Sequence, residues 1–249
     1  MPPAISTPHR RLIAAAEQLA QDTAQLQFGP PVTHVYNPLD YAWPAHRQYL
    51  LQAQPATTRV LFLGMNPGPW GMTQTGVPFG QVEAVRDWLR IDAPIGKPAN
   101  EHPLRPVQGL ACPRSEVSGQ RLWGLFRQRF GEPANFFRQH FVANYCPLVF
   151  MEASARNRTP DKLPPGERQP LVAACDRHLQ AVIDCLEPEF LVGVGAYAED
   201  CLRRAAQSRS SDARIVRILH PSPASPAANR NWALAATEQL VAAGVWEAE

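Results

Sequence analysis

The fold of this 249-residue chain is indicated by Arg59 to Gly80, which reads RVLFLGMNPGPWGMTQTGVPFG. Val60 to Leu63 is a short, wholly apolar run, typical of a strand buried in a parallel sheet. Gly64 to Pro69 follows at once and can continue neither a strand nor a helix. In open α/β sheets, ligands bind beyond the carboxyl ends of the strands. We therefore expect this loop, with its one amide side chain Asn66, to line a ligand site rather than form a plain structural turn.

Apolar runs and segments of helical periodicity alternate along the rest of the chain. Strands are expected at Val60–Leu63, Phe141–Pro147, Phe190–Gly195 and Arg214–Leu219. Helices are expected at 8–26, 45–54, 81–89, 121–130 (with Ser118 as N-cap), 169–186, from the third strand to Gln207, and after Ala227. This alternation predicts an α/β fold of three layers, with a central four-stranded parallel sheet and helices on both of its faces.

The segments between these elements are expected to be irregular. Residues 1–7 resemble a loose tail, and 28–44 is interpreted as ordered loop because it is rich in proline and aromatic residues. Ile91–Pro113 holds five prolines and predicts a long excursion over the surface, and 154–166 a polar loop. The chain is long enough for a good core yet short enough for one domain, which we place at 31–249.

Composition limits the class of protein. With 45% hydrophobic and 18% charged residues, and no apolar run of membrane-spanning length or secretory-signal pattern, the chain is expected to be a soluble globular protein. Its five cysteines follow no CxxC spacing, which favours reduced thiols in a cytosolic compartment and disfavours a zinc or iron–sulfur site. They are Cys112, Cys146, Cys175, Cys185 and Cys201.

The positive charge is almost entirely arginine. The formal net charge is only +2, and Lys97 and Lys162 are the only lysines beside 22 arginines. Arginine forks suit phosphate groups, but the many alanine, arginine and proline residues also fit a biased genome. Composition alone therefore leaves a nucleic-acid partner open.

Three of the four predicted strands end in a polar side chain: Asn66, Asn144 and His220. Because the carboxyl ends of parallel strands share one edge of a sheet, the three side chains should converge on one pocket. An Asn side chain offers a donor and an acceptor side by side and can read the edge of a nucleobase. Phe79 can supply a flat stacking surface. These parts predict recognition of a single base.

Several segments together resemble the single-strand-selective monofunctional uracil-DNA glycosylases. The resemblance extends from VYNPLDYAW, which begins at Val35, to near the C-terminus, and only residues 1–30 fall outside it. The motifs that carry it are GMNPGPWGMTQTGVPFG, RPVQGLACPRSEVSGQRLWG, FVANYCPLVFM with RNRTP, LVGVG, and HPSPASPAANRNW.

This resemblance implies the uracil-DNA glycosylase fold and hydrolysis of the N-glycosidic bond of a uracil flipped out of DNA. It implies that Asn66 positions the attacking water and that Phe79 stacks on the base. Asn144 would then read the O4 and N3 edge, and His220 would hydrogen-bond O2 as negative charge develops on the leaving uracil.

Two further positions follow from the same loop. Met65 and Gly68 are expected to contact the base. In the uracil-only branch of the superfamily a tyrosine stands at the position of Gly68 and blocks substituents on C5. We therefore expect an open pocket there, which would admit 5-hydroxymethyluracil.

The resemblance also implies that Pro221 to Ala228 wedges into the base stack. Ala224 stands where a large basic residue is expected, which predicts weaker activity on duplexes than on single strands. The expected DNA contacts are Ser222, Pro223, Ala224, Ser225, Asn229 and Arg230.

Two other interpretations stay open: a mismatch-type thymine or uracil glycosylase of the same fold, and a non-catalytic binder of damaged bases. The preferred interpretation predicts no cofactor, no metal, no membrane partner and no lyase activity. It also predicts a monomer that acts on DNA in the cytosol or nucleoid, or in the nucleus of a eukaryote.

Overall fold

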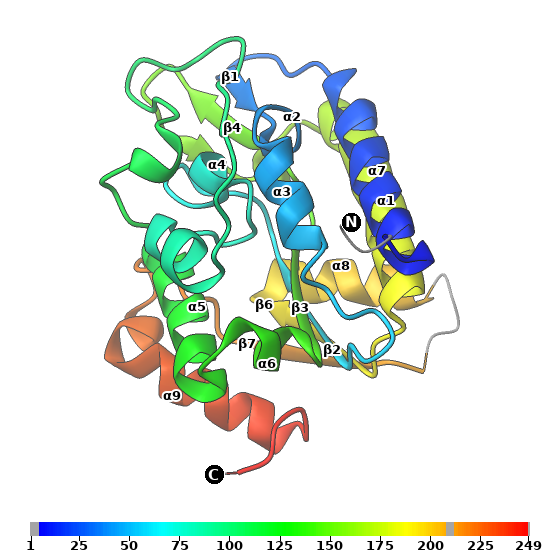
Figure 1. Cartoon of the computed structure of the whole chain (residues 1–249). Coiled ribbons are helices and arrows are strands. Elements are labelled where there is room, and N and C mark those ends of the chain that lie inside the picture. Colours follow the sequence, from blue (N-terminus) through cyan, green and yellow to red (C-terminus); the bar gives the residue numbers. More distant parts are fainter. Residues whose placement is uncertain (1–4, 208–211, 249) are drawn as a thin grey trace.

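The computed structural model describes residues 5–207 and 212–248, and its central sheet has four parallel strands in the order β3–β2–β6–β7 (Figure 1). These strands are β2 (Val60–Gly64), β3 (His140–Asn144), β6 (Phe190–Val194) and β7 (Arg214–Ile218). Every residue of β2, β3 and β6 is buried, as expected of parallel strands covered on both faces. The predicted α/β fold and the four predicted strands are confirmed.

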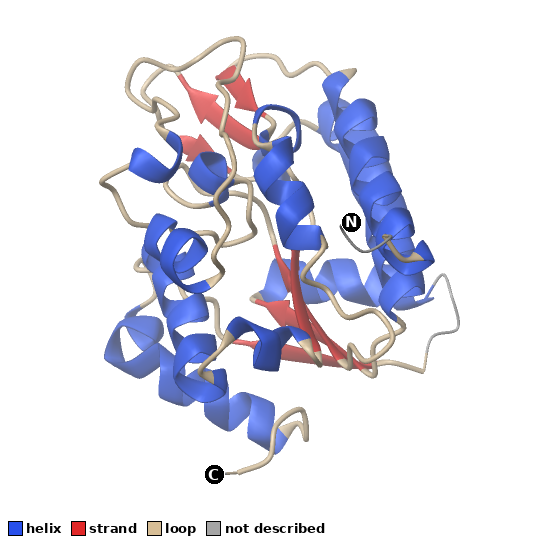
Figure 2. Cartoon of the chain, viewed as in Figure 1, coloured by secondary structure: helices blue, strands red, loops and turns tan. Residues whose placement is uncertain are grey.

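Helices pack around this sheet (Figure 2). α8 (Ala196–Gln207) contacts β2, β6 and β7, while α9 (Pro226–Ala242) contacts β7 and α6 (Pro133–Phe137) contacts β3. α1 (Thr7–Ala24) runs side by side with α7 (Pro165–Leu186).

The first helix belongs to the main core. Ser6 caps α1 by accepting a hydrogen bond from the backbone N–H of His9. Leu12, Ala16 and Leu19, spaced by about one helical turn, are buried against the rest of the protein. The expected helix is thus present, and the part of the expected tail at residues 1–4 lies outside the described residues.

A second, antiparallel sheet was not predicted. It contains β1 (Val32–Tyr36), β4 (Val149–Glu152) and β5 (Asn157–Arg158), and α2 (Pro38–Tyr41) follows β1. The prediction of irregular loops at 28–44 and 154–166 was therefore wrong in part. β1 pairs with a strand more than a hundred residues away, and such short strands of mixed polarity carry no local signal of their partner.

Several helix limits also differ from the prediction. α3 (Trp43–Leu50) begins and ends earlier, and the helix expected at 81–89 contains the π-helical turn η1 (Ala84–Trp88). α5 (Val117–Phe130) begins at Val117, so Ser118 lies inside the helix and is not its N-cap.

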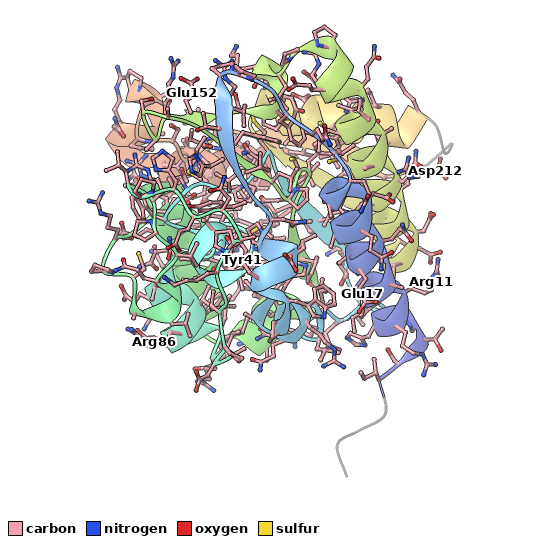
Figure 3. The ribbon with its side chains drawn as sticks, turned by 90° about the horizontal axis from the view of Figure 1, so that it is seen from above. Arg11, Glu17, Tyr41, Arg86, Glu152 and Asp212 are labelled. Carbon is pink, nitrogen blue, oxygen red and sulfur yellow. The ribbon has the colours of Figure 1, made fainter. Side chains whose placement is uncertain are left out.

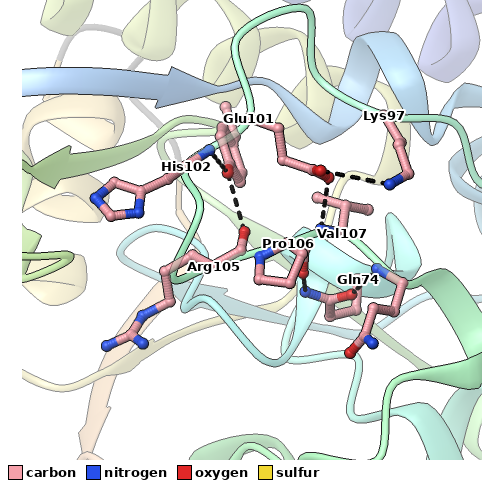
Figure 4. A network of polar contacts seen from close by, with 9 residues as sticks. Gln74, Lys97, Glu101, His102, Arg105, Pro106 and Val107 are labelled. Atoms are coloured by element: carbon pink, nitrogen blue, oxygen red, sulfur yellow. Dashed lines mark hydrogen bonds and ion pairs between the residues drawn. The ribbon is translucent and has the colours of Figure 1, made fainter.

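The long segment 91–113 is tied down by side-chain hydrogen bonds (Figure 4). Glu101 accepts from the backbone N–H of Val107 at 2.8 Å and pairs with Lys97. Gln74 donates to the carbonyl of Pro106 at 3.1 Å and accepts from the backbone N–H of Gln108 at 2.8 Å. The segment is irregular as predicted, apart from the short turn η2 (Gly109–Ala111).

The view from above places Tyr41 among the inner side chains and Arg11 and Arg86 at the periphery (Figure 3). The Tyr41 hydroxyl donates to the carbonyl of Thr73 at 2.7 Å. Thr73 belongs to the short helix α4 (Met72–Thr75). Tyr41 belongs to a small buried cluster with Tyr36 and Val149, apart from the main core, so this cluster anchors the loop after β2. A third short turn, η3 (Pro160–Lys162), precedes α7.

Candidate active site

The loop after β2 and the end of β3 are joined by the backbone. Gly64 and Asn144 lie opposite each other in the parallel register. Beyond them, the N–H of Tyr145 donates to the carbonyl of Gly64, and the N–H of Cys146 donates to that of Met65, both at 2.9 Å. The two predicted Asn motifs are therefore held side by side at one edge of the sheet.

Asn66 has one end of its amide fixed by the protein. Its Nδ2 donates to the carbonyl oxygens of Leu148 at 3.2 Å and Pro67 at 3.3 Å. These bonds set the orientation of the amide and leave Oδ1 as the atom available to accept a hydrogen bond from a water.

Phe79 and Asn144 meet over Gly64. A Cβ atom at Gly64 would lie 2.5 Å from Asn144 Oδ1 and 2.7 Å from Phe79 Cζ, too close for either to stay in place. Only glycine permits this approach. The ring of Phe79 and the amide of Asn144 thus form a stacking surface and a hydrogen-bonding edge at the same point.

The amide of Asn144 is only partly satisfied. Its Nδ2 donates to Met72 Sδ at 3.3 Å, a weak acceptor. Its Oδ1 is buried and has no hydrogen-bond partner within residues 5–207 and 212–248. Most buried polar atoms in proteins are paired, so this acceptor is one that a ligand donor would satisfy.

Phe79 is held in an uncommon backbone conformation. Its φ of 54° lies in the left-handed region, which costs a residue other than glycine roughly 1–2 kcal/mol. The carbonyl of Pro78 accepts from Trp123 Nε1 at 3.1 Å, and that of Gly80 accepts from Thr75 Oγ1 at 2.8 Å. The fold therefore imposes this conformation, which is a feature common at functional sites.

His220 follows β7 and reaches the same edge. Its Cβ lies close to Gly195, where an added Cβ would be 3.2 Å away, and its ring centroid is 6.5 Å from that of Phe79. Burial lowers the pKa of the imidazole below 6.5. His220 is therefore neutral at pH 7 and carries one N–H donor.

The loop after His220 is fixed from α5. Arg121 donates from Nη1 to the carbonyls of Pro221 at 3.1 Å and Ser222 at 3.3 Å, and from Nη2 to Asn229 Oδ1 at 2.8 Å. Asn229 in turn donates to the carbonyl of Pro223 at 2.8 Å. The Asn229 amide, expected among the DNA contacts, is thus occupied in holding the loop.

The tip of this loop faces solvent. Pro223, Ala224 and Arg230 are exposed. Ser225 is the N-cap of α9, where its Oγ accepts from the N–H of Ala228 at 3.4 Å, and Ser222 Oγ accepts from the N–H of Ala224 at 3.2 Å. The segment expected to be the wedge is therefore an exposed turn followed by the first residues of a helix.

The space beside Gly68 is not empty as the sequence had suggested, because the Glu116 carboxyl group lies against it. A Cβ atom on Gly68 would lie 2.5 Å from Glu116 Oε2. Glu116 immediately precedes α5, which brings its side chain across from a segment about fifty residues away in sequence. The sequence offered no signal for this contact beyond the short motif SEVSG.

A small internal cavity lies behind Asn144. Its volume is about 30 Å³, against roughly 300–1,000 Å³ for ligand pockets. It is lined by residues of α1, α2, α3, α7 and β3 together with Met72, Pro78 and Pro147. It has room for about one water and none for a nucleobase.

Comparison with known proteins agrees with this geometry. A sequence model described as the uracil DNA glycosylase superfamily matches residues 52–241, most of the chain. The chain belongs to the uracil DNA glycosylase superfamily. The match includes Asn66, Phe79, Asn144 and His220.

Within this superfamily the chain belongs with the single-strand selective monofunctional uracil-DNA glycosylases. It is 49% identical over 228 residues to the protein of that name from Mus musculus, and 50% identical to that from Rattus norvegicus. Each alignment covers 92% of this chain and 82% of the relative. The protein from Bos taurus is 49% identical over 223 residues, 90% of this chain and 82% of its own.

A solved structure has the same fold. The crystal structure of wild-type Pedobacter heparinus SMUG2 matches with a TM-score of 0.62 over 93% of this chain and 97% of its own. The sequences are only 16% identical, so the likeness concerns the fold alone.

All five cysteines are free and buried. Within the described ranges, no group of three or more His, Cys, Asp or Glu side chains is placed to hold a metal ion. In the same part of the chain, none of the helices could cross a membrane.

Sequence reasoning missed three residues that shape the glycosylase site. Glu116 lies against Gly68, and Arg121 holds the loop after His220. Trp70, in the Asn66 loop, is in contact with both Arg105 and Arg114, whose guanidinium carbons are 5.2 and 4.5 Å from its ring centroid. Each contact joins distant parts of the chain, so no local pattern could have identified it.

Proposed function

We propose that this chain removes uracil, and also 5-hydroxymethyluracil, from single- and double-stranded DNA by hydrolysing the N-glycosidic bond of a flipped-out nucleotide. Membership of the family makes the chain a monofunctional uracil-DNA glycosylase of base-excision repair. The roles that we assign to the residues rest on one observation. The Phe79 ring and the Asn144 amide both lie against Gly64, and the His220 ring is beside them.

The base is recognised by stacking and by its edge. Phe79 stacks on the flipped uracil, and Asn144 pairs with it: Oδ1 accepts from N3–H and Nδ2 donates to O4. The buried Oδ1 that lacks a partner supports this role. Cytosine presents a donor in place of O4 and an acceptor in place of N3–H, and such a mismatch costs about 1–3 kcal/mol.

Hydrolysis uses the other two residues. Asn66 Oδ1 holds the water that attacks the sugar carbon, while its Nδ2 stays bound to Leu148. As the glycosidic bond breaks, negative charge moves onto the base, and the N–H of neutral His220 donates to O2. A preorganised donor of this kind is worth about 3–4 kcal/mol. An amide is a weak base, so the water is positioned rather than deprotonated and turnover is modest.

The loop after His220 separates the stacked bases. Pro223 and Ala224 form its exposed tip, Ser222, Ser225 and Arg230 lie where they can contact the backbone of the DNA, and Asn229 holds the turn. Because Ala224 is too small to fill the gap left by a flipped nucleotide, single strands are preferred to duplexes.

The absence of lyase activity follows from the two lysines. Lyase chemistry usually needs an amine nucleophile. Lys97 pairs with Glu101 at 3.3 Å and Lys162 with Asp161 at 3.1 Å, both away from the strand ends that form the site. The product is therefore an abasic site in an intact strand.

The experiment is incubation of the chain with a labelled single strand that contains one uracil, followed by alkali. Strand breaks only after alkali support the glycosylase, and no breaks would favour a non-catalytic binder of damaged bases. Borohydride added during the reaction should trap no covalent adduct; an adduct on either lysine would contradict the monofunctional assignment.

The same proposal includes DNA as the partner, a monomer as the working form, and a location in the compartment that holds the DNA. The base site is built from one chain alone, which supports the monomer. Size-exclusion chromatography with light scattering tests it, and a dimer at working concentrations would contradict it.

A further inference from the structure

Glu116 lies against the Asn66 loop although no part of the mechanism above uses it. It immediately precedes α5, and together with the first turn of that helix it contacts three parts of the site. Ser118 Oγ donates to the carbonyl of Pro221 at 3.4 Å, and Gly119 packs so closely on Phe79 that a Cβ would overlap the Phe79 carbonyl. Glu116 itself points at the Asn66 loop, toward Gly68 and Gly71.

Two glycines make the space for its carboxyl group. A Cβ on Gly68 would lie 2.5 Å from Oε2 and 2.8 Å from the carboxyl carbon, and one on Gly71 would overlap the same oxygen. A side chain at either position would have to displace Glu116. The close fit between the loop and the carboxyl group is therefore built into the backbone.

One oxygen of the carboxyl group is buried without compensation. Oε2 is fully covered and has no hydrogen-bond partner among the described residues. Burial raises the pKa of the carboxyl to about 7. An unpaired buried polar group costs about 1–3 kcal/mol, so Glu116 does not serve the stability of the free protein.

The position of Glu116 relative to the base follows from Asn144. The Nδ2 atom, which reads O4, contacts Met72 Sδ, and Met72 follows Gly71 directly. In a uracil ring C5 is bonded to C4 on the side away from N3. The C5 edge therefore faces the turn from Gly68 to Met72, where the Glu116 carboxyl group lies.

We propose that Glu116 determines specificity at C5 of the flipped base, by forming a hydrogen bond to a polar substituent such as the hydroxyl of 5-hydroxymethyluracil. This inference rests on the proposed function and names the residue that selects among its substrates. A hydroxyl group both donates and accepts, so it pairs with Glu116 whether the carboxyl is protonated or ionised. The methyl group of thymine does neither and leaves Oε2 unpaired.

The test compares single-turnover excision of 5-hydroxymethyluracil and uracil from otherwise identical single strands. Glu116→Met removes the hydrogen bond and should lower the ratio of the two rates about tenfold, the factor expected for roughly one buried hydrogen bond. Glu116→Gln, whose amide both donates and accepts, should keep most of the ratio. Glu83→Met, a change of an exposed glutamate, is the matched control and should leave the ratio unaltered.

Thermal unfolding separates this role from a structural one. Because Oε2 lacks a partner, Glu116→Met should unfold at the same temperature as wild type or higher, whereas a structural carboxyl would lose stability.

Three outcomes would overturn the inference. They are an unchanged ratio in Glu116→Met, equal losses on both substrates, and a wild-type chain that excises uracil but not 5-hydroxymethyluracil. A wild-type chain that releases no uracil at all would instead contradict the proposed function, on which the inference rests.

Discussion

Buried polar groups are hydrogen-bonded in the aromatic core around His140, whereas two in the site around Asn144 lack partners among the described residues. In the core, His140 Nδ1 donates to the carbonyl of Phe136 at 3.2 Å, and Nε2 accepts from Trp246 Nε1 at 3.0 Å. In the site, Asn144 Oδ1 and Glu116 Oε2 are buried, and no partner for either lies in the described parts of the chain.

The two residues His140 and Asn144 stand at opposite ends of the same strand, β3. The difference in pairing therefore does not come from a poorly packed region. Here a polar group that serves the fold, the His140 ring, is paired within it, while the two oxygens assigned to the ligand stay unpaired until the ligand arrives. The predictions below test this contrast, starting from the largest expected effect.

Replacing Asn66 should abolish excision of the base and leave DNA binding nearly unchanged. Asn66→Ala removes the acceptor for the water, so the single-turnover rate should fall by about 10³-fold or more. Affinity for a uracil-containing strand should change by less than about 1 kcal/mol. If the excision rate and DNA binding are both lost, Asn66 has a structural role. The distinction between polar groups of the core and polar groups of the site would then not hold for it.

Removing the His220 imidazole should have the next largest effect. His220→Leu deletes the donor to O2 and should lower the single-turnover rate roughly 10²- to 10³-fold, with a small change in affinity. The measurement is excision under enzyme excess, with DNA binding followed by fluorescence anisotropy. A nearly normal rate would exclude His220 from the mechanism.

The buried histidines of the core should make the folded protein less stable in acid. Burial lowers the pKa of His46 and of His140 to about 4 each, whereas histidines in the unfolded chain titrate near 6.5. Between pH 6.5 and 4 these two histidines therefore bind protons in the unfolded state and stay unprotonated in the folded state. The free energy of unfolding should drop over this window by up to about 3 kcal/mol for each residue.

His140→Gln keeps a donor and an acceptor but cannot titrate. Urea unfolding measured from pH 7 to 4 should therefore show a smaller drop in the free energy of unfolding than in wild type. Parallel curves for the two proteins would show that His140 does not contribute to the acid sensitivity.

The smallest effect is the most direct test of the contrast. Asn144→Leu removes an acceptor that has no partner and should leave the free energy of unfolding unchanged, or raise it by up to about 1 kcal/mol. His140→Leu leaves the Trp246 N–H and the Phe136 carbonyl unpaired and should cost about 1–3 kcal/mol. Equal losses in the two variants, measured by urea unfolding, would remove the distinction between fold and site.

Much of the fold could be predicted because its signals are local. The central strands are continuous apolar runs, and α1 and α8 have clear helical periodicity, so their positions differ from the prediction by only a residue or two. β1 was missed because it gains its stability by pairing with β4, a partner far away in the sequence. Similarly, Ser118 looked like an N-cap, but tertiary contacts extend the helix one residue beyond it.

The sequence by itself determined the four-stranded sheet, the family, and the gathering of Asn66, Asn144 and His220 at one edge, because parallel strands present their carboxyl ends together. Only the tertiary structure decided what surrounds them. It placed the Phe79 ring and the Asn144 amide over Gly64, and it brought Glu116 onto Gly68 where the sequence predicted empty space. The physical reason is that packing depends on which side chains meet across long separations in the chain, and no local pattern records those encounters.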